Sequence, residues 1–290
     1  MTRNIYDQFT KDCLEELFRP FGKVEVDLKV ASEVREIDFF FQPDRAFFDD
    51  LTPLGKLGQL GLTPAIIEPY RNPITINEVR KCLKKSLDVQ AALQRRSRRE
   101  ETALSEAELP MLWILSPTIS QSVIQKFKGE LDLEHWGEGI YFCGEGFRTV
   151  LVAIHQLPQT PETLWLRLFG RGRVQVEAIE ELQSLPEDNK FRDRILEIVS
   201  NMIAILEVRE QEQETLDIEE REFLMQLSTV YTKRLEEAEQ LGEQRGEERA
   251  QRNIARKLLT QGMEIDRIAE LTELPLEEVA KLRETPPSNQ

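Results

Sequence analysis

The chain of 290 residues is predicted to form an α/β domain followed by a long all-α, partly coiled-coil C-terminal tail. Two patterns predict this architecture. In the first half, stretches with apolar residues at every second position, typical of half-buried strands, alternate with stretches at helical spacing. In the second half only helical spacing recurs, and the segment from 218 to about 261 is rich in Glu, Arg and Gln, with Gly242 and Gly246 as its main breakers.

One helix and three strands are predicted at the start of the domain. Apolar residues at helical spacing over 6–18 predict an amphipathic helix, which Pro20 and Gly22 end. Three strands are predicted to follow, at 24–30, 34–41 and 63–69. We expect the first two to pair antiparallel because a short connection joins them, and we expect either a loop or a short helix at 54–62.

A second helix is predicted after the third strand. Thr75 and Glu78 form a capping-box pattern, in which each side chain satisfies an amide that the helix start leaves free, so a helix should run from Ile76 to about Leu93. Its apolar face is predicted to carry Val79, Cys82, Leu83 and Leu87, and its opposite face Arg80, Lys81, Lys84 and Lys85. Residues 95–108, which open with four arginines, are predicted to be a polar linker.

The rest of the chain is predicted as further strands and then helices alone. Strands are expected at 111–115, 139–143 and 149–157, and a helix at 119–127. The predicted domain organisation is an α/β domain at 1–157, a helical extension at 158–217, a long charged helix or coiled coil at 218–253 and a short helical motif at 254–290. Gly262 and Pro275 are expected to separate the helices of that last motif.

Charge and composition limit the function classes. The net charge is −15, of which −4 falls on residues 1–157 and −11 on residues 158–290. Tight nonspecific binding of nucleic acid needs a basic surplus, so the bulk charge argues against that role while leaving room for a local basic face beside an acidic site. Apolar runs are far shorter than the roughly 20 residues that span a bilayer, and the N-terminus lacks an export signal, so we expect a cytoplasmic protein with no membrane partner.

The three cysteines and two histidines indicate neither a disulfide framework nor structural zinc. Cys13, Cys82 and Cys143 are odd in number and far apart, which suits reduced and partly buried thiols.

Two acidic residues on the predicted strands carry a resemblance to a known fold. Asp38 lies in Glu-Ile-Asp-Phe-Phe on the second strand, and Glu68 lies in Ile-Ile-Glu-Pro-Tyr on the third. With the order helix, three strands, helix, strand, they make the chain resemble the PD-(D/E)XK nuclease core. More narrowly, the chain resembles bacterial proteins of the recombination-promoting nuclease/putative transposase (Rpn) group, whose tails are similar to residues 255–274. The resemblance implies a Mg²⁺-dependent DNA endonuclease, a hydrolase linked to DNA recombination or mobile elements.

The resemblance also implies roles for particular residues. Asp38 and Glu68 would be metal ligands, because carboxylates on adjacent strands can hold Mg²⁺, which activates water and stabilises charge on the scissile phosphate. Glu16, or its neighbour Glu15, would add a third carboxylate from the first helix. In this family a lysine usually lies two residues after the glutamate, and here that position is Tyr70.

Other basic residues could take over part of the role of that lysine. Arg71 can bind phosphate, although a guanidinium stays protonated and cannot act as a base. A lysine from the next helix, Lys81, Lys84 or Lys85, could reach the site; Arg71 and Lys84 therefore join Asp38 and Glu68 as candidate catalytic residues.

A non-catalytic interpretation stays open. Asp38 could be a buried acid held by backbone amides, the basic helix face could be a solvated surface, and a degenerate nuclease fold could serve as a binding or assembly module. In that case the main contact, with a protein partner or a second copy of the chain, would be made through residues 218–290, since a long charged helix needs a partner to be stable.

Overall fold

The computed structural model describes residues 5–30, 35–211, 220–225, 227, 250–272 and 274–284. The chain divides into two compact units, Met1–Gln226 and Leu227–Gln290, and each is described by itself.

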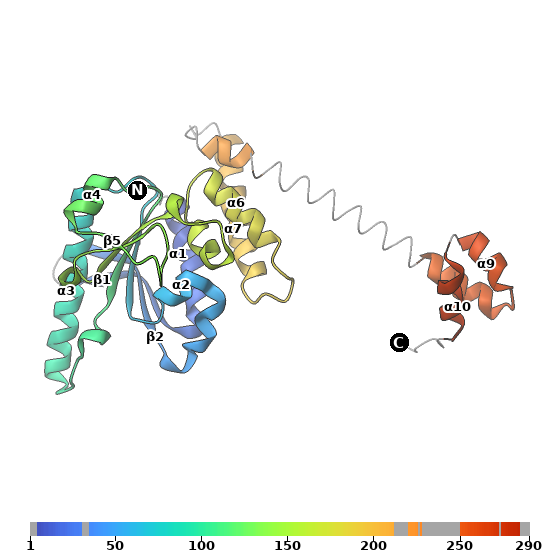
Figure 1. Cartoon of the computed structure of the whole chain (residues 1–290), viewed down its shortest axis with the longest axis horizontal. Helices are drawn as coiled ribbons and strands as arrows, with labels where there is room; N and C mark the ends of the chain where they lie inside the picture. Colours follow the sequence, from blue (N-terminus) through green and yellow to red (C-terminus); the bar gives the residue numbers. More distant parts are fainter. Residues whose placement is uncertain are drawn as a thin grey trace. The chain divides into compact units, whose positions relative to one another are not determined.

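The first unit contains a mixed sheet and helices on both of its faces (Figure 1). Its helices are α1 Ile5–Phe18, α2 Gly55–Leu60, α3 Ile76–Arg99, α4 Gln121–Lys126, α5 Leu164–Arg167, α6 Arg173–Gln183 and α7 Arg192–Gln211. Its strands are β1 Gly22–Val30, β2 Arg35–Pro43, β3 Ala65–Pro69, β4 Met111–Ser116, β5 Glu130–Leu131, β6 Ile140–Phe142 and β7 Thr149–Ala153. The predicted α/β architecture is confirmed.

The seven strands are ordered β1-β2-β3-β4-β7-β6-β5. Strands β1, β2 and β3 pair antiparallel, whereas β3, β4 and β7 pair parallel. At the far edge of the sheet, β6 pairs antiparallel with β7, and β5 pairs antiparallel with β6. The parallel strands are buried almost throughout, as expected where helices cover both faces of a sheet. The long β1–β2 hairpin adds two antiparallel strands on one side of the parallel strands β3, β4 and β7.

Two helices cover opposite faces of the sheet beside this hairpin. Phe18 of α1 packs against Phe39 and Phe41, with ring centroids 6.0 Å and 4.5 Å away. Val79 and Cys82 of α3 belong instead to the cluster that contains Phe40 and Ile66. Since successive residues of a strand point to opposite faces, α1 and α3 enclose the same strands from two sides.

The helices after residue 157 pack onto the sheet domain. Helix α7 contacts α1 and helix α5 contacts α2, and the indole nitrogen of Trp165 donates to the backbone oxygen of Pro53 at 3.1 Å. Gly55, with φ +54°, permits a close approach between the start of α2 and the backbone of Glu162. Residues 158–226 are thus part of the first compact unit.

The second unit contains a small helical cluster. Residues 250–260, α9 Ile265–Thr272 and α10 Leu276–Glu284 are helical, as predicted, and Gly262, with φ +82°, follows the first of these helices. Ala255, Ile268 and Val279 form its buried centre. Most of the predicted coiled coil at 218–253 lies outside the described residues. Among the helices that the structure describes, none is both long enough and apolar enough to cross a membrane.

Helix α3 differs from its prediction in length and in the faces it presents. Its capping box at Thr75 and Glu78 is confirmed, but it continues to Arg99, so the predicted linker at 95–108 begins within the helix. Leu87, assigned to the apolar face, is 55% exposed, and Lys85, assigned to the solvent face, reaches inward to Glu68. A continuous helix forms there because Arg, Gln and Ala all favour helix, and no glycine or proline interrupts residues 76–99.

Candidate functional site

A row of acidic residues crosses the three antiparallel strands. In the register of β2 and β3, Phe39 lies opposite Ile67, so the next step along the pair places Asp38 opposite Glu68. In the register of β1 and β2, the position that would face Asp38 is Asp27, where the backbone has φ +53° and the pairing is interrupted. Like charges at directly opposed positions destabilise a sheet unless cations compensate them.

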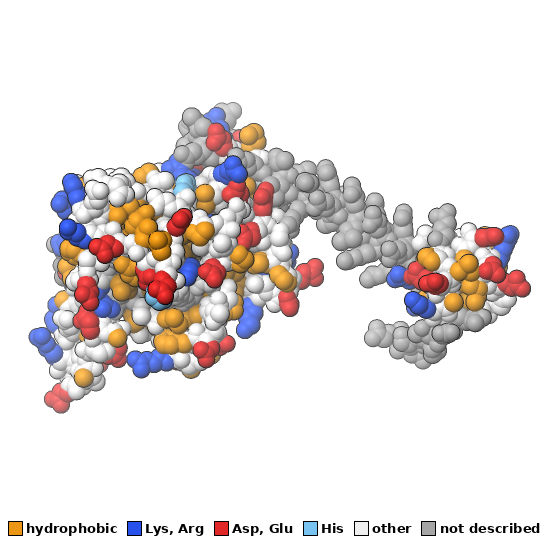
Figure 2. All heavy atoms as spheres, viewed as in Figure 1, with side chains coloured by type: hydrophobic (Ala, Val, Ile, Leu, Met, Phe, Trp, Pro, Cys, Tyr) orange, Lys and Arg blue, Asp and Glu red, His pale blue; other side chains and the backbone are white. Residues whose placement is uncertain are grey.

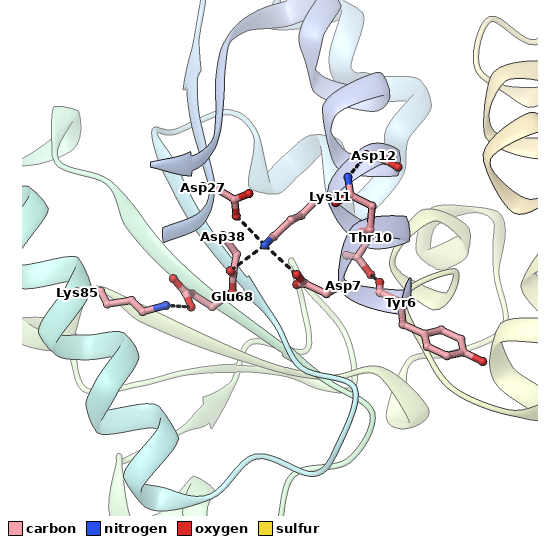
Figure 3. A network of polar contacts seen from close by, with 10 residues as sticks. Tyr6, Asp7, Thr10, Lys11, Asp12, Asp27, Asp38, Glu68 and Lys85 are labelled. Atoms are coloured by element: carbon pink, nitrogen blue, oxygen red, sulfur yellow. Dashed lines mark hydrogen bonds and ion pairs between the residues drawn. The ribbon is translucent and has the colours of Figure 1, made fainter. Parts of the chain in front are cut away.

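Lys11 supplies one of those cations from helix α1 (Figure 3). Its ammonium nitrogen lies 2.8 Å from Asp27, 3.1 Å from Asp38 and 2.9 Å from Asp7, the last being one helical turn earlier on α1. The side chain of Lys11 is only 5% exposed. Burial lowers the pKa of Lys11, but the hydrogen bonds to Asp27 and Asp7 and the charge of Asp38 outweigh burial, and the net effect raises it. Lys11 therefore remains charged.

Lys85 supplies the second cation from helix α3. Its ammonium group donates to Glu68 Oε2 at 2.6 Å, and Glu68 is only 1% exposed (Figure 3). The other carboxylate oxygen, Glu68 Oε1, is buried with no donor beside it, although a protonated Glu68 can donate a hydrogen bond to Asp38. A buried acceptor without a partner is uncommon in a folded protein and calls for an ion, a water or a strained site.

The environment of Glu68 changes its acidity. Burial, followed by the negative charge of Asp38, raises the pKa of Glu68 to about 7, although Lys85 acts in the opposite direction. Glu68 is thus poised to gain or lose a proton close to neutral pH, as residues at functional sites often are.

Tyr70, at the position where the resembled family usually has a lysine, does not supply a charge. Its hydroxyl lies 3.1 Å from the sulfur of Cys82, which in turn lies 4.0 Å from Glu68 Oε2. Burial, and then Cys82, raises the pKa of Tyr70 above its ordinary value, so the hydroxyl stays neutral. Burial, and then Glu68, raises the pKa of Cys82 to about 12, and this thiol stays neutral as well. Lys85 is the cation in contact with Glu68.

The structure brings together only some of the candidate residues from the sequence. Asp38 and Glu68 lie opposite each other on β2 and β3. The contact with Glu68 is made by Lys85, while its neighbour Lys84 is exposed. Glu16 lies five residues after Lys11 on α1, which places the two side chains about 140° apart around the helix. The carboxylate that α1 brings to the cluster is Asp7.

Arg71 lies beside the site rather than within the acidic row. Its guanidinium lies over the ring of Tyr6, and both residues line a pocket of about 310 Å³ together with Asp7 and Tyr70. Because Asp7 also holds Lys11, the pocket adjoins the acidic row directly.

The carboxylates suit a hard divalent cation. Asp38 and Glu68 offer oxygen ligands, which Mg²⁺ prefers, and no donor lies beside Glu68 Oε1. Within the described ranges, however, no group of three or more His, Cys, Asp or Glu side chains is arranged to hold a metal ion. The residues present therefore fit a two-carboxylate site, in which waters and substrate phosphates complete the coordination of Mg²⁺.

Sequence reasoning missed three members of the cluster: Lys11, Asp7 and Asp27. Asp7 and Lys11 are spaced i, i+4, the spacing of a helical ion pair, and this is the signal that could have found them. Asp27 shares its face of the hairpin with Asp38, but only the register of β1 and β2 shows this.

Comparisons with protein-family models, with curated proteins and with solved structures found no match to this chain. The site is therefore interpreted from its own geometry.

Proposed function

We propose that the protein is a Mg²⁺-dependent nuclease that hydrolyses phosphodiester bonds of DNA, with a core of the PD-(D/E)XK type. The observation that carries the proposal is the cross-strand pair of Asp38 and Glu68, with Lys85 bound to Glu68 and one oxygen of Glu68 left without a donor. Two converging carboxylates can hold a metal ion that polarises the phosphate and lowers the pKa of a bound water, and an adjacent lysine can meet the negative charge that develops.

Each residue has a separate role in this proposal. Asp38 and Glu68 would hold Mg²⁺, which when bound would lower the pKa of a water molecule and stabilise negative charge on the phosphate. Lys85 holds Glu68 in place from α3 and carries a positive charge that can meet the developing charge of the phosphate. Lys85 would thereby take the part of the lysine that Tyr70 replaces.

A second candidate function is favoured by Lys11. Its ammonium group already lies among Asp7, Asp27 and Asp38, so a built-in cation neutralises part of the row that a metal would otherwise neutralise. A chain in which this arrangement is permanent would be a nuclease-like fold without catalysis, serving as a binding or assembly module whose protein contact lies in residues 218–290.

The two candidates are separated by metal binding and by cleavage. Supercoiled plasmid is incubated with Mg²⁺ or Mn²⁺, and Mn²⁺ binding is followed independently by electron paramagnetic resonance. The nuclease proposal expects nicking and Mn²⁺ binding by the unaltered protein, and loss of both in Asp38→Asn and Glu68→Gln. Asp132→Asn, which removes a partly exposed carboxylate after β5, is the control and should change neither.

The outcome that favours the second candidate is equally concrete. An unaltered protein that neither nicks DNA nor binds Mn²⁺, together with a Lys11→Met variant that gains Mn²⁺ binding, would show that Lys11 closes the site.

A further inference from the structure

Helix α3 concentrates positive charge in an otherwise acidic protein. Over 76–99 it carries eight Lys and Arg against two acidic residues, a net charge of +6, whereas the whole chain has a net charge of −15. Figure 2 shows Lys and Arg side chains gathered along the edge of the first unit where Figure 1 places α3. This contrast exists because α3 continues through the four arginines that the sequence suggested were part of a linker.

Four of the seven exposed basic side chains of α3 lie close together around the helix. At 100° per residue, Arg80, Lys84, Arg95 and Arg98 lie within about 60° of one another, opposite the buried Cys82. All four of these basic side chains are exposed, and we call them the basic stripe. Lys81, which is also exposed, and Lys85 lie about 40° and 80° beyond Arg95 around the helix, and Lys85 contacts Glu68.

The length of the stripe suits a polyanion with regular spacing. From Arg80 to Arg98 the stripe extends over 18 residues, about 27 Å at 1.5 Å per residue, which corresponds to about eight phosphates of one DNA strand at 3.4 Å each. Lys84 and Arg95, eleven residues apart, are separated by about 16 Å along the axis, so the two halves of the stripe can contact phosphates several nucleotides apart.

We infer that the basic stripe of α3 is a surface on which the phosphate backbone of double-stranded DNA lies. This inference deepens the proposed function and rests on it for the choice of DNA. Charge complementarity supports this occupant: the stripe offers positive charge to a phosphate backbone, and its helix delivers Lys85 to the site.

Binding can be measured without cleavage. A fluorescein-labelled 20-base-pair duplex is titrated with the full chain in EDTA, and fluorescence anisotropy is recorded from 50 to 300 mM KCl. One variant changes the four residues of the stripe, Arg80, Lys84, Arg95 and Arg98, to Gln, which keeps a good helix former at each position. The control variant changes four exposed basic residues on other elements, Arg19, Lys23, Lys190 and Arg194, to Gln, and loses the same charge.

The stripe variant should bind at least ten-fold more weakly at 100 mM KCl, and its slope of log Kd against log salt should fall by about 3.6, since each of the four lost phosphate contacts removes about 0.9. The control variant should stay within two-fold of the unaltered protein. Equal effects of the two variants, or no binding by the unaltered protein, would overturn the inference. Displacement of the duplex by polyglutamate as readily as by unlabelled DNA would also overturn it, because the stripe would then accept any polyanion.

A cleavage assay with Mg²⁺ distinguishes failure of the inference about the basic stripe from failure of the proposed nuclease function. Stripe-dependent binding without any cleavage would leave the inference standing and remove the nuclease proposal. Cleavage that the stripe variant retains in full would leave the nuclease proposal standing and remove the inference.

Discussion

Replacing Glu68 with Gln tests the buried acidic row directly, because it removes one negative charge while keeping the size of the side chain. Burial and the charge of Asp38 raise the pKa of Glu68 to about 7, compared with an ordinary value of 4.5. Between these two pH values the native state holds a proton that the unfolded chain has released. The free energy of unfolding therefore falls as pH rises from about 4.5 to about 7.

The magnitude follows from the same difference in pKa. At 1.36 kcal/mol per pKa unit, the folded protein loses about 3 kcal/mol of stability across this window. The Gln variant has no such loss, so its stability relative to the unaltered protein should improve by about 2 to 3 kcal/mol between pH 5 and pH 8. The substitution also changes the contact with Lys85, which alters the variant's free energy of unfolding by a similar amount at every pH. The quantity to measure is therefore the change of stability with pH.

Urea unfolding followed by tryptophan fluorescence is the assay, because Trp113, Trp136 and Trp165 are the three tryptophans of the chain and all lie in the first unit. Glu106→Gln, at a largely exposed position, is the control and should show no comparable pH dependence. The reasoning would be refuted if the difference in free energy of unfolding between Glu68→Gln and the unaltered protein stayed constant from pH 5 to pH 8. It would also be refuted if that difference changed in favour of the unaltered protein as pH rises. Mg²⁺ should stabilise the unaltered protein at pH 8 and leave Glu68→Gln unaffected.

Three further substitutions test other parts of the structure. Lys85→Met leaves the buried Glu68 without its cation, so it should abolish nicking and cost about 1.5 to 3 kcal/mol in urea unfolding at pH 8, whereas Lys190→Met, at an exposed position outside the stripe and the site, should change both little. Lys11→Met leaves three carboxylates without their shared cation and should cost about 3 to 5 kcal/mol at pH 8; a cost below 1 kcal/mol would mean that the ion pairs do not stabilise the fold. Gly55→Ala would bring a methyl group into the backbone of Glu162 at positive φ, and we expect thermal unfolding at least 5 °C lower; an unchanged midpoint would contradict the close approach.

Local patterns predicted most of the elements because their causes are local. The alternation in β1 and the i, i+3 and i+4 spacing in α1 can be read without knowing the fold, and the capping box at Thr75 sets the start of α3 within a few residues. The end of α3 was predicted too early because the polar run at 95–99, with its four arginines, resembles a linker, although arginine favours helix. Charge density alone does not end a helix.

The sequence by itself determined the α/β class, the strand pair that carries Asp38 and Glu68, and the absence of a lysine two residues after Glu68. Only the tertiary structure decided which cations meet these acids. Lys11 and Lys85 come from helices on opposite faces of the sheet, and no pattern along the chain links Lys11 to Asp38 or Lys85 to Glu68. The physical reason is that strand register and helix packing set distances between residues far apart in sequence, and ion pairs depend on those distances.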